Sequence, residues 1–255
     1  MDMLRIEDLS LSYGDKPVVQ NLNLRVKKGQ AVSIIGPNAS GKSTILKSIA
    51  GIIKPAGGKI FIEEKDISKM DSKRLAQKVS ILLQQNRTPD DISVEELVYF
   101  GRYPRKKWFE GFESSDKKII EEAMKLTNTF ALRDKTLETL SGGERQRAWI
   151  AMALAQEPDI LLFDEPTTYL DLAHQIEFLE LVNRLNKETR VTVVLVLHDL
   201  NQAARYGNYL FAMKDGRLFA QGSPQEVLTP QNILSIYNIE ADIINRPDRL
   251  VVIPR

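Results

Sequence analysis

One short stretch, Gly36 to Thr44 with the sequence GPNASGKST, constrains this chain most, because it fits the phosphate-binding pattern G-x-x-x-x-G-K-[ST]. The apolar run at residues 31–35 just before it is typical of a buried parallel strand. Apolar residues after it recur at helical spacing until Gly51, which is expected to end the helix. A strand, a glycine-rich loop and a helix in this order predict a nucleotide site.

The residue types in this stretch suit the capture of a phosphate group. Glycines let the backbone wrap closely around a phosphate, and the N–H groups of the loop and of the helix start point at it. Lys42 adds a full positive charge, and the Ser43 hydroxyl suits a Mg²⁺ ion that bridges the outer phosphates. The predicted nucleotide-binding residues are Gly36, Pro37, Asn38, Ala39, Ser40, Gly41, Lys42, Ser43 and Thr44.

Two adjacent carboxylates, Asp164 and Glu165, follow a second apolar run that is predicted to form a buried strand. In phosphoryl transfer an Asp in this place holds Mg²⁺, and an adjacent Glu can orient and deprotonate the attacking water. Two acids at a strand end are otherwise a common solvated loop, but the upstream phosphate loop favours the catalytic interpretation. Because switch GTPases do not need this glutamate, the pair favours an ATPase.

Polar residues also follow two further predicted strands, at residues 79–83 and 191–197. Gln84 stands where the sheet of an α/β protein meets its ligand, although a plain polar loop explains it equally well. His198 is either a satisfied core histidine, with Asp199 capping the next helix, or a contact to the γ-phosphate. The residues alone leave these alternatives open.

Two other places have both a structural and a functional interpretation. Ser141 and Glu144 fit a capping box at a helix start, and together with Gly142 and Gly143 this helix start is also an exposed anion site. Tyr13 stands at a turn between two predicted strands, where it either packs at the rim or stacks on a base. Its position alone favours packing.

Residues 86–140 differ from the rest of the chain, because they are charged and helical, with a capping box from Ser93 to Glu96. The segment after Pro224 is expected to hold short helices and a tail. The basic cluster within residues 86–140 is interpreted as a solvated or partner-facing loop: Arg102, Arg105, Lys106 and Lys107, beside Tyr103 and Trp108.

Composition narrows the possible partners. The 255 residues contain 35 Lys or Arg and 34 Asp or Glu, a net charge of +1, so no nucleic-acid partner is expected. The absence of cysteine excludes disulfides and cysteine-bound metals. Apolar runs are only of strand length, and the first residues lack the apolar core of a signal peptide. Membrane association is therefore expected to go through a partner protein.

Six motifs stand in the order found in the ATPase subunits of ATP-binding cassette (ABC) transporters, which the chain resembles over essentially its whole length. They are GPNASGKST, the glutamine after Leu83, LSGGERQR, LLFDEP, Tyr169-Leu170-Asp171 and His198. The resemblance is greatest to the ATPases of iron-chelate importers, through residues 101–104, 144–156, 171–182 and 196–206. Ala39 departs from the family's usual glycine. A methyl group is tolerated there if φ is negative, but it weakens phosphate capture if φ is positive.

The resemblance implies an α/β fold. Its core is that of a P-loop NTPase (RecA-like) with a mainly parallel sheet, joined by an N-terminal antiparallel β-subdomain and an inserted helical subdomain. Residues 1–85 and 141–222 would form the nucleotide-binding core with the β-subdomain. Residues 86–140 would form the helical subdomain, and 223–255 the C-terminal helices and tail.

The resemblance also implies roles for the site residues. Tyr13 would stack on adenine, which reverses the interpretation from its position. The implied catalytic set is Lys42 on the phosphates, Glu165 as general base, His198 on the γ-phosphate and Gln84, with Mg²⁺ held by Ser43, Gln84 and Asp164. The residues implied to act on the nucleotide of a second copy are Ser141, Gly142, Gly143 and Glu144, with Asp171 linking the two sites.

The implied working unit is a head-to-tail homodimer that binds two ATP molecules with Mg²⁺. Residues 84–108 would seat a helix of a membrane-spanning permease, which also receives an extracytoplasmic substrate-binding protein. The chain would work at the cytoplasmic face of the cell membrane, where ATP hydrolysis energises uptake of a ferric siderophore-type chelate. Cobalamin or haem as cargo, and a soluble ABC ATPase of iron–sulfur cluster assembly, remain as alternatives.

Overall fold

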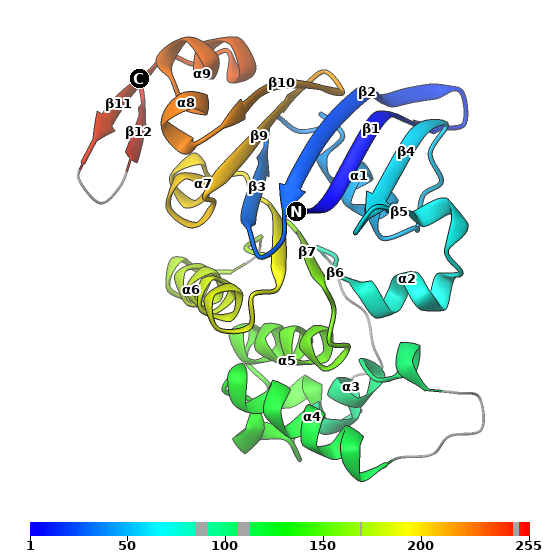
Figure 1. Ribbon diagram of the computed structural model, residues 1–255. Helices are drawn as coiled ribbons and strands as arrows, with labels where there is room; N and C mark the ends of the chain where they lie inside the picture. The colour runs from blue at the N-terminus through cyan, green and yellow to red at the C-terminus, as the bar shows by residue number, and fades with distance from the viewer. Residues whose placement is uncertain (85–90, 107–112, 169, 247–249) are drawn as a thin grey trace.

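The centre of the fold is a six-stranded sheet with the order β10-β9-β3-β8-β7-β6 (Figure 1). The computed structural model describes residues 1–84, 91–106, 113–168, 170–246 and 250–255. Neighbouring strands of this sheet are parallel, except that β9 and β10 form an antiparallel hairpin. The strands are β3 (Ala31–Ile35), β6 (Val79–Leu82), β7 (Ile160–Asp164), β8 (Thr192–Val196), β9 (Tyr209–Lys214) and β10 (Arg217–Gly222).

An antiparallel sheet from the N-terminal part of the chain covers one face of this centre. In β2, buried Leu22, Leu24 and Val26 alternate with exposed polar residues, as a half-buried strand requires. Helix α1 (Lys42–Ile49) lies between the two sheets and buries Ile45 and Leu46 completely. The sheet has the order β2-β1-β4-β5, with β1 (Asp2–Tyr13), β2 (Lys16–Lys27), β4 (Gly57–Ile62) and β5 (Lys65–Asp66).

Helices cover the opposite face of the six-stranded sheet. Phe178, Leu179 and Val182 of α6 pack there with the sheet residues Phe163 and Leu195. Strands β3, β7 and β8 are consequently buried along their whole length, which explains why each is a continuous apolar run. The helices are α5 (Gly142–Ala155), α6 (Leu172–Thr189), α7 (Leu200–Tyr206), α8 (Pro224–Val227) and α9 (Pro230–Tyr237).

A helical lobe with its own apolar core packs against α5 (Figure 1). Helix α5 contributes Ala148 and Ala151 to the lobe and Ile150 and Ala153 to the main core, so it joins the two. The Ser93 capping box is confirmed, with Glu96 N–H donating to the Ser93 hydroxyl at 3.2 Å. The lobe contains α3 (Val94–Phe100), η2 (Tyr103–Arg105), α4 (Ser114–Leu126), η3 (Phe130–Leu132) and η4 (Leu137–Thr139), while η1 (Ile67–Lys69) and α2 (Ser72–Lys78) precede it.

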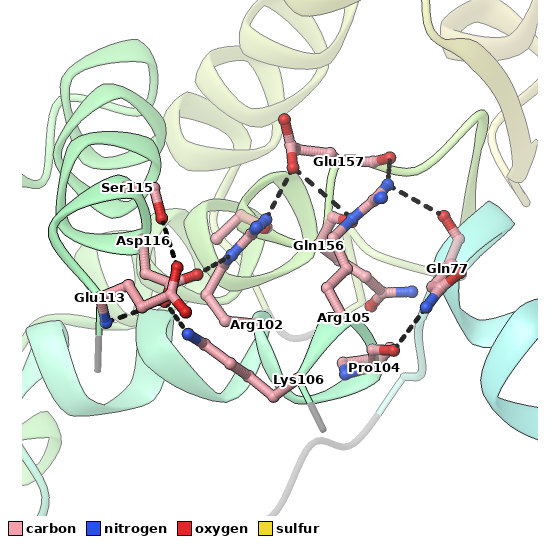
Figure 2. Close-up of polar contacts among 11 residues, drawn as sticks. Gln77, Arg102, Pro104, Arg105, Lys106, Glu113, Ser115, Asp116, Gln156 and Glu157 are labelled. Carbon is pink, nitrogen blue, oxygen red and sulfur yellow. Dashed lines mark hydrogen bonds and ion pairs between the residues drawn. The ribbon is translucent and has the colours of Figure 1, made fainter. Parts of the chain in front are cut away.

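The interpretation of the basic cluster as a solvated or partner-facing loop is wrong for Arg102 and Lys106, whose side chains are largely buried, whereas Arg105 is exposed. Arg102 is only 5% exposed and pairs with Asp116 at 3.0 Å and Glu157 at 2.8 Å (Figure 2). Lys106 pairs with the same buried Asp116.

Arg105 donates to the backbone carbonyls of Gln156 and Glu157, just after α5, at 2.8 and 2.7 Å. Its other backbone partner is the carbonyl of Gln77, in α2, at 3.4 Å. The cluster therefore ties the lobe to the end of α5 and to α2. Lys107 and Trp108 lie outside the described residues.

The C-terminal segment differs from the expected short helices and tail. Helices α8 and α9 are present, but the end of the chain is a hairpin of β11 (Ala241–Asn245) and β12 (Leu250–Pro254). Asn201 of α7 holds the hairpin, accepting from the N–H of Val252 at 2.8 Å and donating to its carbonyl at 3.1 Å. In the described ranges, no helix has the length and apolar character needed to span a bilayer.

Candidate nucleotide-binding site

Parallel strand order brings the predicted site residues to one edge of the sheet. Strands β3, β8, β7 and β6 are successive parallel neighbours, so their carboxyl ends lie side by side. The phosphate loop follows β3, His198 follows β8, Asp164 ends β7 and Gln84 follows β6. This is the edge at which open α/β sheets bind their ligands.

The phosphate loop holds its lysine inward. Lys42 is 4% exposed, and its Nζ donates to the carbonyls of Gly36 and Pro37, each at 2.9 Å. Burial lowers the pKa of Lys42, and the carboxylates of Glu165 and Asp164 partly oppose this effect. The loop therefore encloses the Lys42 ammonium group near two carboxylates. A phosphate group can bind here through contacts with Lys42 and the loop amides.

Ser43 and Asp164 form the candidate Mg²⁺ site. The Ser43 hydroxyl donates to Oδ1 of Asp164 at 2.6 Å, so the two oxygens already lie together. Burial raises the pKa of Asp164, which is only 4% exposed. Mg²⁺ prefers oxygen ligands and usually takes only one or two from protein carboxylates, with phosphates and water completing the shell. This pair of oxygens fits such an ion.

The structure also limits which further groups could bind the predicted Mg²⁺ ion. Within the described ranges, no group of three or more His, Cys, Asp or Glu side chains could hold a metal, so a Mg²⁺ ion would depend on phosphate oxygens and water. Gln84 is exposed at the end of β6 and does not line the cavity described below. Its metal-binding role stays a prediction.

Glu165 and His198 contact each other across the ends of β7 and β8. Nε2 of His198 lies 2.6 Å from Oε1 of Glu165, and because a carboxylate only accepts, Nε2 carries the hydrogen. The alternative of a core histidine is wrong, since the His198 side chain is 42% exposed. The proposed cap is confirmed, with Asp199 accepting from Asn201 N–H at 2.7 Å.

Glu165 also has an unusual backbone conformation. Its φ is 51°, in the left-handed region that non-glycine residues rarely adopt. Strained residues of this kind concentrate at functional sites, where the surrounding structure enforces them. The conformation turns the chain sharply after β7, and the Glu165 side chain reaches His198 and is 16% exposed.

A cavity of about 680 Å³ joins the phosphate loop to Glu165 and His198, whereas Gly36, Pro37 and Asp164 do not line it. Tyr13, 53% exposed, lies at this cavity, which agrees with base stacking better than with packing. Lys16 and Asp215 also line it, and sequence reasoning missed both, because neither stands in a motif. The predicted residues that line it are Tyr13, Asn38, Ala39, Ser40, Gly41, Lys42, Ser43, Thr44, Glu165 and His198.

Ala39 has a φ of 62°, so the condition for tolerating its methyl group without strain is not met. A side chain in this region costs roughly 1–2 kcal/mol. Gly41, two residues later, has a φ of 96°, and a Cβ there would lie 2.6 Å from Cγ2 of Val19. Glycine is thus required at position 41, whereas position 39 carries a strained alanine.

Ser141, Gly142, Gly143 and Glu144 do not line this cavity. The capping box is confirmed, since Glu144 N–H donates to the Ser141 hydroxyl at 3.3 Å and the Glu144 carboxylate accepts from Ser141 N–H at 2.9 Å. Asp171 caps α6 by accepting from the backbone N–H of His174, and it is likewise absent from the cavity lining. Tyr169 lies outside the described residues.

Fold and cavity together define a P-loop nucleotide-binding protein. Residues 19–168 match the family model for ABC transporters. This chain belongs to the ABC transporter family, whose ATP-binding subunits are ATPases.

Two curated relatives resemble the chain along most of its length. The iron(3+)-hydroxamate import ATP-binding protein FhuC of Bacillus subtilis is 44% identical, with 97% of this chain and 92% of that protein covered. The ferric enterobactin transport ATP-binding protein FepC of Escherichia coli is 45% identical, with 96% and 90% covered.

Solved structures of ABC proteins have the same fold as this chain. An inward-facing ABC transporter of metal-chelate type superposes with a TM-score of 0.86 at 28% identity, covering 100% of this chain and 97% of that one. A dimeric ATP-binding cassette bound to ADP and phosphate superposes with a TM-score of 0.74 at 31% identity, covering 87% and 99%.

Proposed function

We propose that this chain is the ATP-hydrolysing subunit of an ABC importer that energises the uptake of a ferric siderophore-type chelate. The main support for ATP hydrolysis is the cavity that joins the phosphate loop to Glu165 and His198. The cargo class is supported by relatives named for iron-chelate import at 44–45% identity. Because their chelates differ, we assign the class and no individual chelate.

The residues divide the chemistry between them. Tyr13 stacks on the adenine, and the loop amides and Lys42 bind the phosphates. Glu165 orients the attacking water and accepts its proton, while His198 holds the Glu165 carboxylate in place and contacts the γ-phosphate. Ser43, Asp164 and Gln84 hold Mg²⁺, which when bound neutralises phosphate charge.

The motif residues outside the cavity support a head-to-tail homodimer. Ser141 to Gly143 begin a helix at which Ser141 and Gly142 are exposed and Gly143 is buried, and all three lie apart from the nucleotide cavity of their own chain. A helix start of this kind binds anions, so the γ-phosphate of a second copy is the fitting partner. The similarity to a dimeric cassette with ADP and phosphate supports this arrangement.

The dimer would work at the cytoplasmic face of the membrane, bound to permease subunits through residues 84–108. An extracytoplasmic binding protein would deliver the chelate to the permease. ATP binding closes the dimer and hydrolysis reopens it, so the two states differ in affinity and can drive a conformational cycle.

The test is a pull-down of the tagged Glu165→Gln variant from detergent-solubilised membranes with ATP, with partners identified by mass spectrometry. This variant is expected to bind ATP without turning it over, because the water lacks its base. We expect a polytopic permease to be recovered, and less of it with the matched Lys42→Ala variant. The permease's own relatives would then narrow the cargo, with cobalamin and haem as the competing outcomes.

A different recovery would overturn the importer proposal. Soluble iron–sulfur assembly proteins, found without any membrane partner, would assign the chain to a soluble ABC ATPase. The nucleotide chemistry of Glu165 would survive that outcome, whereas near wild-type hydrolysis by Glu165→Gln would remove it.

A further inference from the structure

The N-terminal end of α5 packs against the segment that follows the catalytic Glu165. We call this contact surface the α5–α6 seam. Gln146 donates its side-chain N–H to the carbonyl of Pro166, and Arg147 pairs with Glu177 at 3.5 Å. The seam consists of Gly142, Gly143, Gln146 and Arg147 from α5, against Pro166, Leu170, His174 and Glu177.

His174 makes the closest approach in the seam. A methyl group added at Gly143 would lie 2.4 Å from Cδ2 and 3.1 Å from Nε2 of His174, so the imidazole ring rests directly on the Gly143 backbone. The other side of the ring faces Asp171, with 2.8 Å between Nδ1 and Oδ1. Since the carboxylate only accepts, Nδ1 is the donor.

Asp171 is itself held in place by this contact. The same Oδ1 also accepts from the backbone N–H of His174 at 2.9 Å. The backbone N–H and the ring of His174 lower the pKa of Asp171, so the carboxylate is kept ionised. One histidine thus links Gly143 of the α5 helix start to Asp171 at the start of α6, 28 residues apart in sequence.

Asp171 and the His174 ring are open to solvent, whereas Gly143 is buried beneath that ring at the start of α5. The Asp171 side chain is 65% exposed and the His174 side chain 38% exposed. Neither residue lines the nucleotide cavity of its own chain. A contact made through them can therefore reach only something outside this cavity, and the proposed function puts the nucleotide site of a second copy there.

We propose that His174 is a positioning residue that fixes Gly143 and Asp171 relative to each other, so that the exposed Ser141 and Gly142 at the start of α5 meet the nucleotide site of the second copy together with Asp171. This inference rests on the proposed homodimer. His174 acts through the two residues that it touches. Without its ring, the α5 helix start and Asp171 could shift independently, and closing the dimer would then have to order both of them.

Three variants separate the two contacts of His174. His174→Phe keeps a ring against Gly143 and loses the donor to Asp171. His174→Asn keeps a side-chain donor for Asp171 and loses the ring, and His174→Ala loses both. Glu177→Gln is the matched control, because it removes an exposed seam contact that touches neither Gly143 nor Asp171.

Each variant is combined with Glu165→Gln, and two constants are measured with ATP. The first is the dissociation constant of ATP from dilute, monomeric protein, and the second is the dimer dissociation constant from analytical ultracentrifugation. We expect His174→Ala to leave the first unchanged and to raise the second about tenfold, as the loss of one hydrogen bond and its packing would. His174→Phe and His174→Asn should fall between, and Glu177→Gln should match the parent.

The outcomes are distinguishable. A parent Glu165→Gln chain that binds ATP and dimerises identically with all three His174 substitutions would overturn the inference and leave the proposed function intact. A parent chain that never dimerises with ATP would overturn the proposed dimer and the inference with it. A merely structural role for His174 would lower the melting temperature without changing the dimer constant, which would also refute it.

Discussion

Replacing the strained Ala39 by glycine is expected to stabilise the protein. The φ of 62° costs alanine roughly 1–2 kcal/mol, and glycine removes that cost. Glycine also gives the unfolded chain extra freedom, which offsets about 0.4–1 kcal/mol of the gain. The expected net increase in the free energy of unfolding therefore lies between about 0 and 1.6 kcal/mol, with a centre near 0.8 kcal/mol.

This gain can be converted into a melting temperature. At about 2.1 cal/mol/K per residue, the 255-residue chain unfolds with an entropy of about 0.5 kcal/mol/K. Ala39→Gly should thus raise Tm by about 1–2 °C, measured by differential scanning calorimetry at one scan rate. ATP titration in parallel should show binding no weaker than that of the parent.

Two matched variants should lower Tm instead of raising it. Ala50→Gly changes an alanine with a φ of −75°, so it adds freedom to the unfolded chain and also removes a partly buried methyl group; it should lower Tm by at least a similar amount. Gly41→Ala should lower Tm more, because its φ is 96° and its Cβ would overlap Val19. A fall in Tm with Ala39→Gly, comparable to that with Ala50→Gly, would refute the strain at position 39.

Three further predictions concern buried charges. Lys42→Ala should abolish ATP binding, so unchanged affinity by calorimetry would contradict the phosphate-loop assignment. Burial raises the pKa of Asp164 in the folded protein. Without nucleotide, the ionised carboxylate therefore destabilises the fold, and this loss of stability grows as the pH rises above the unfolded pKa of about 3.9. The Tm of Asp164→Asn relative to the parent should therefore increase from about pH 4 to pH 7, and a pH-independent difference would contradict this. Asp116→Asn leaves Arg102 and Lys106 without their shared carboxylate and should cost about 3–5 kcal/mol, or roughly 6–10 °C. A loss below about 1 °C would show that the buried cluster does not hold the lobe.

Much of the site could be predicted from sequence because its signals are local. The phosphate loop needs glycine, lysine and serine at set spacings between one strand and one helix, and all of these lie within nine residues. The strands that end at Asp164 and His198 are continuous apolar runs, as buried parallel strands must be. Capping boxes at Ser93 and Ser141 were equally readable, since each is closed within one helical turn.

What only the tertiary structure decided depends on contacts between residues far apart in the chain. Arg102 looked like a surface charge because its partners Asp116 and Glu157 stand 14 and 55 positions away. The Glu165 to His198 contact and the seat of His174 on Gly143 need β7, β8, α5 and α6 to be packed before they exist.

The backbone of Ala39 and the C-terminal hairpin were also settled only in three dimensions. Alanine normally avoids positive φ, and the residues next to Ala39 do not indicate that it has one. The conformation of the phosphate loop imposes it. Strands β11 and β12 are short and depend on Asn201 and on burial of Leu250 and Val252 against the main core. Local propensity determines which segments can form. The long-range packing that offsets the entropy of ordering them determines which contacts they make.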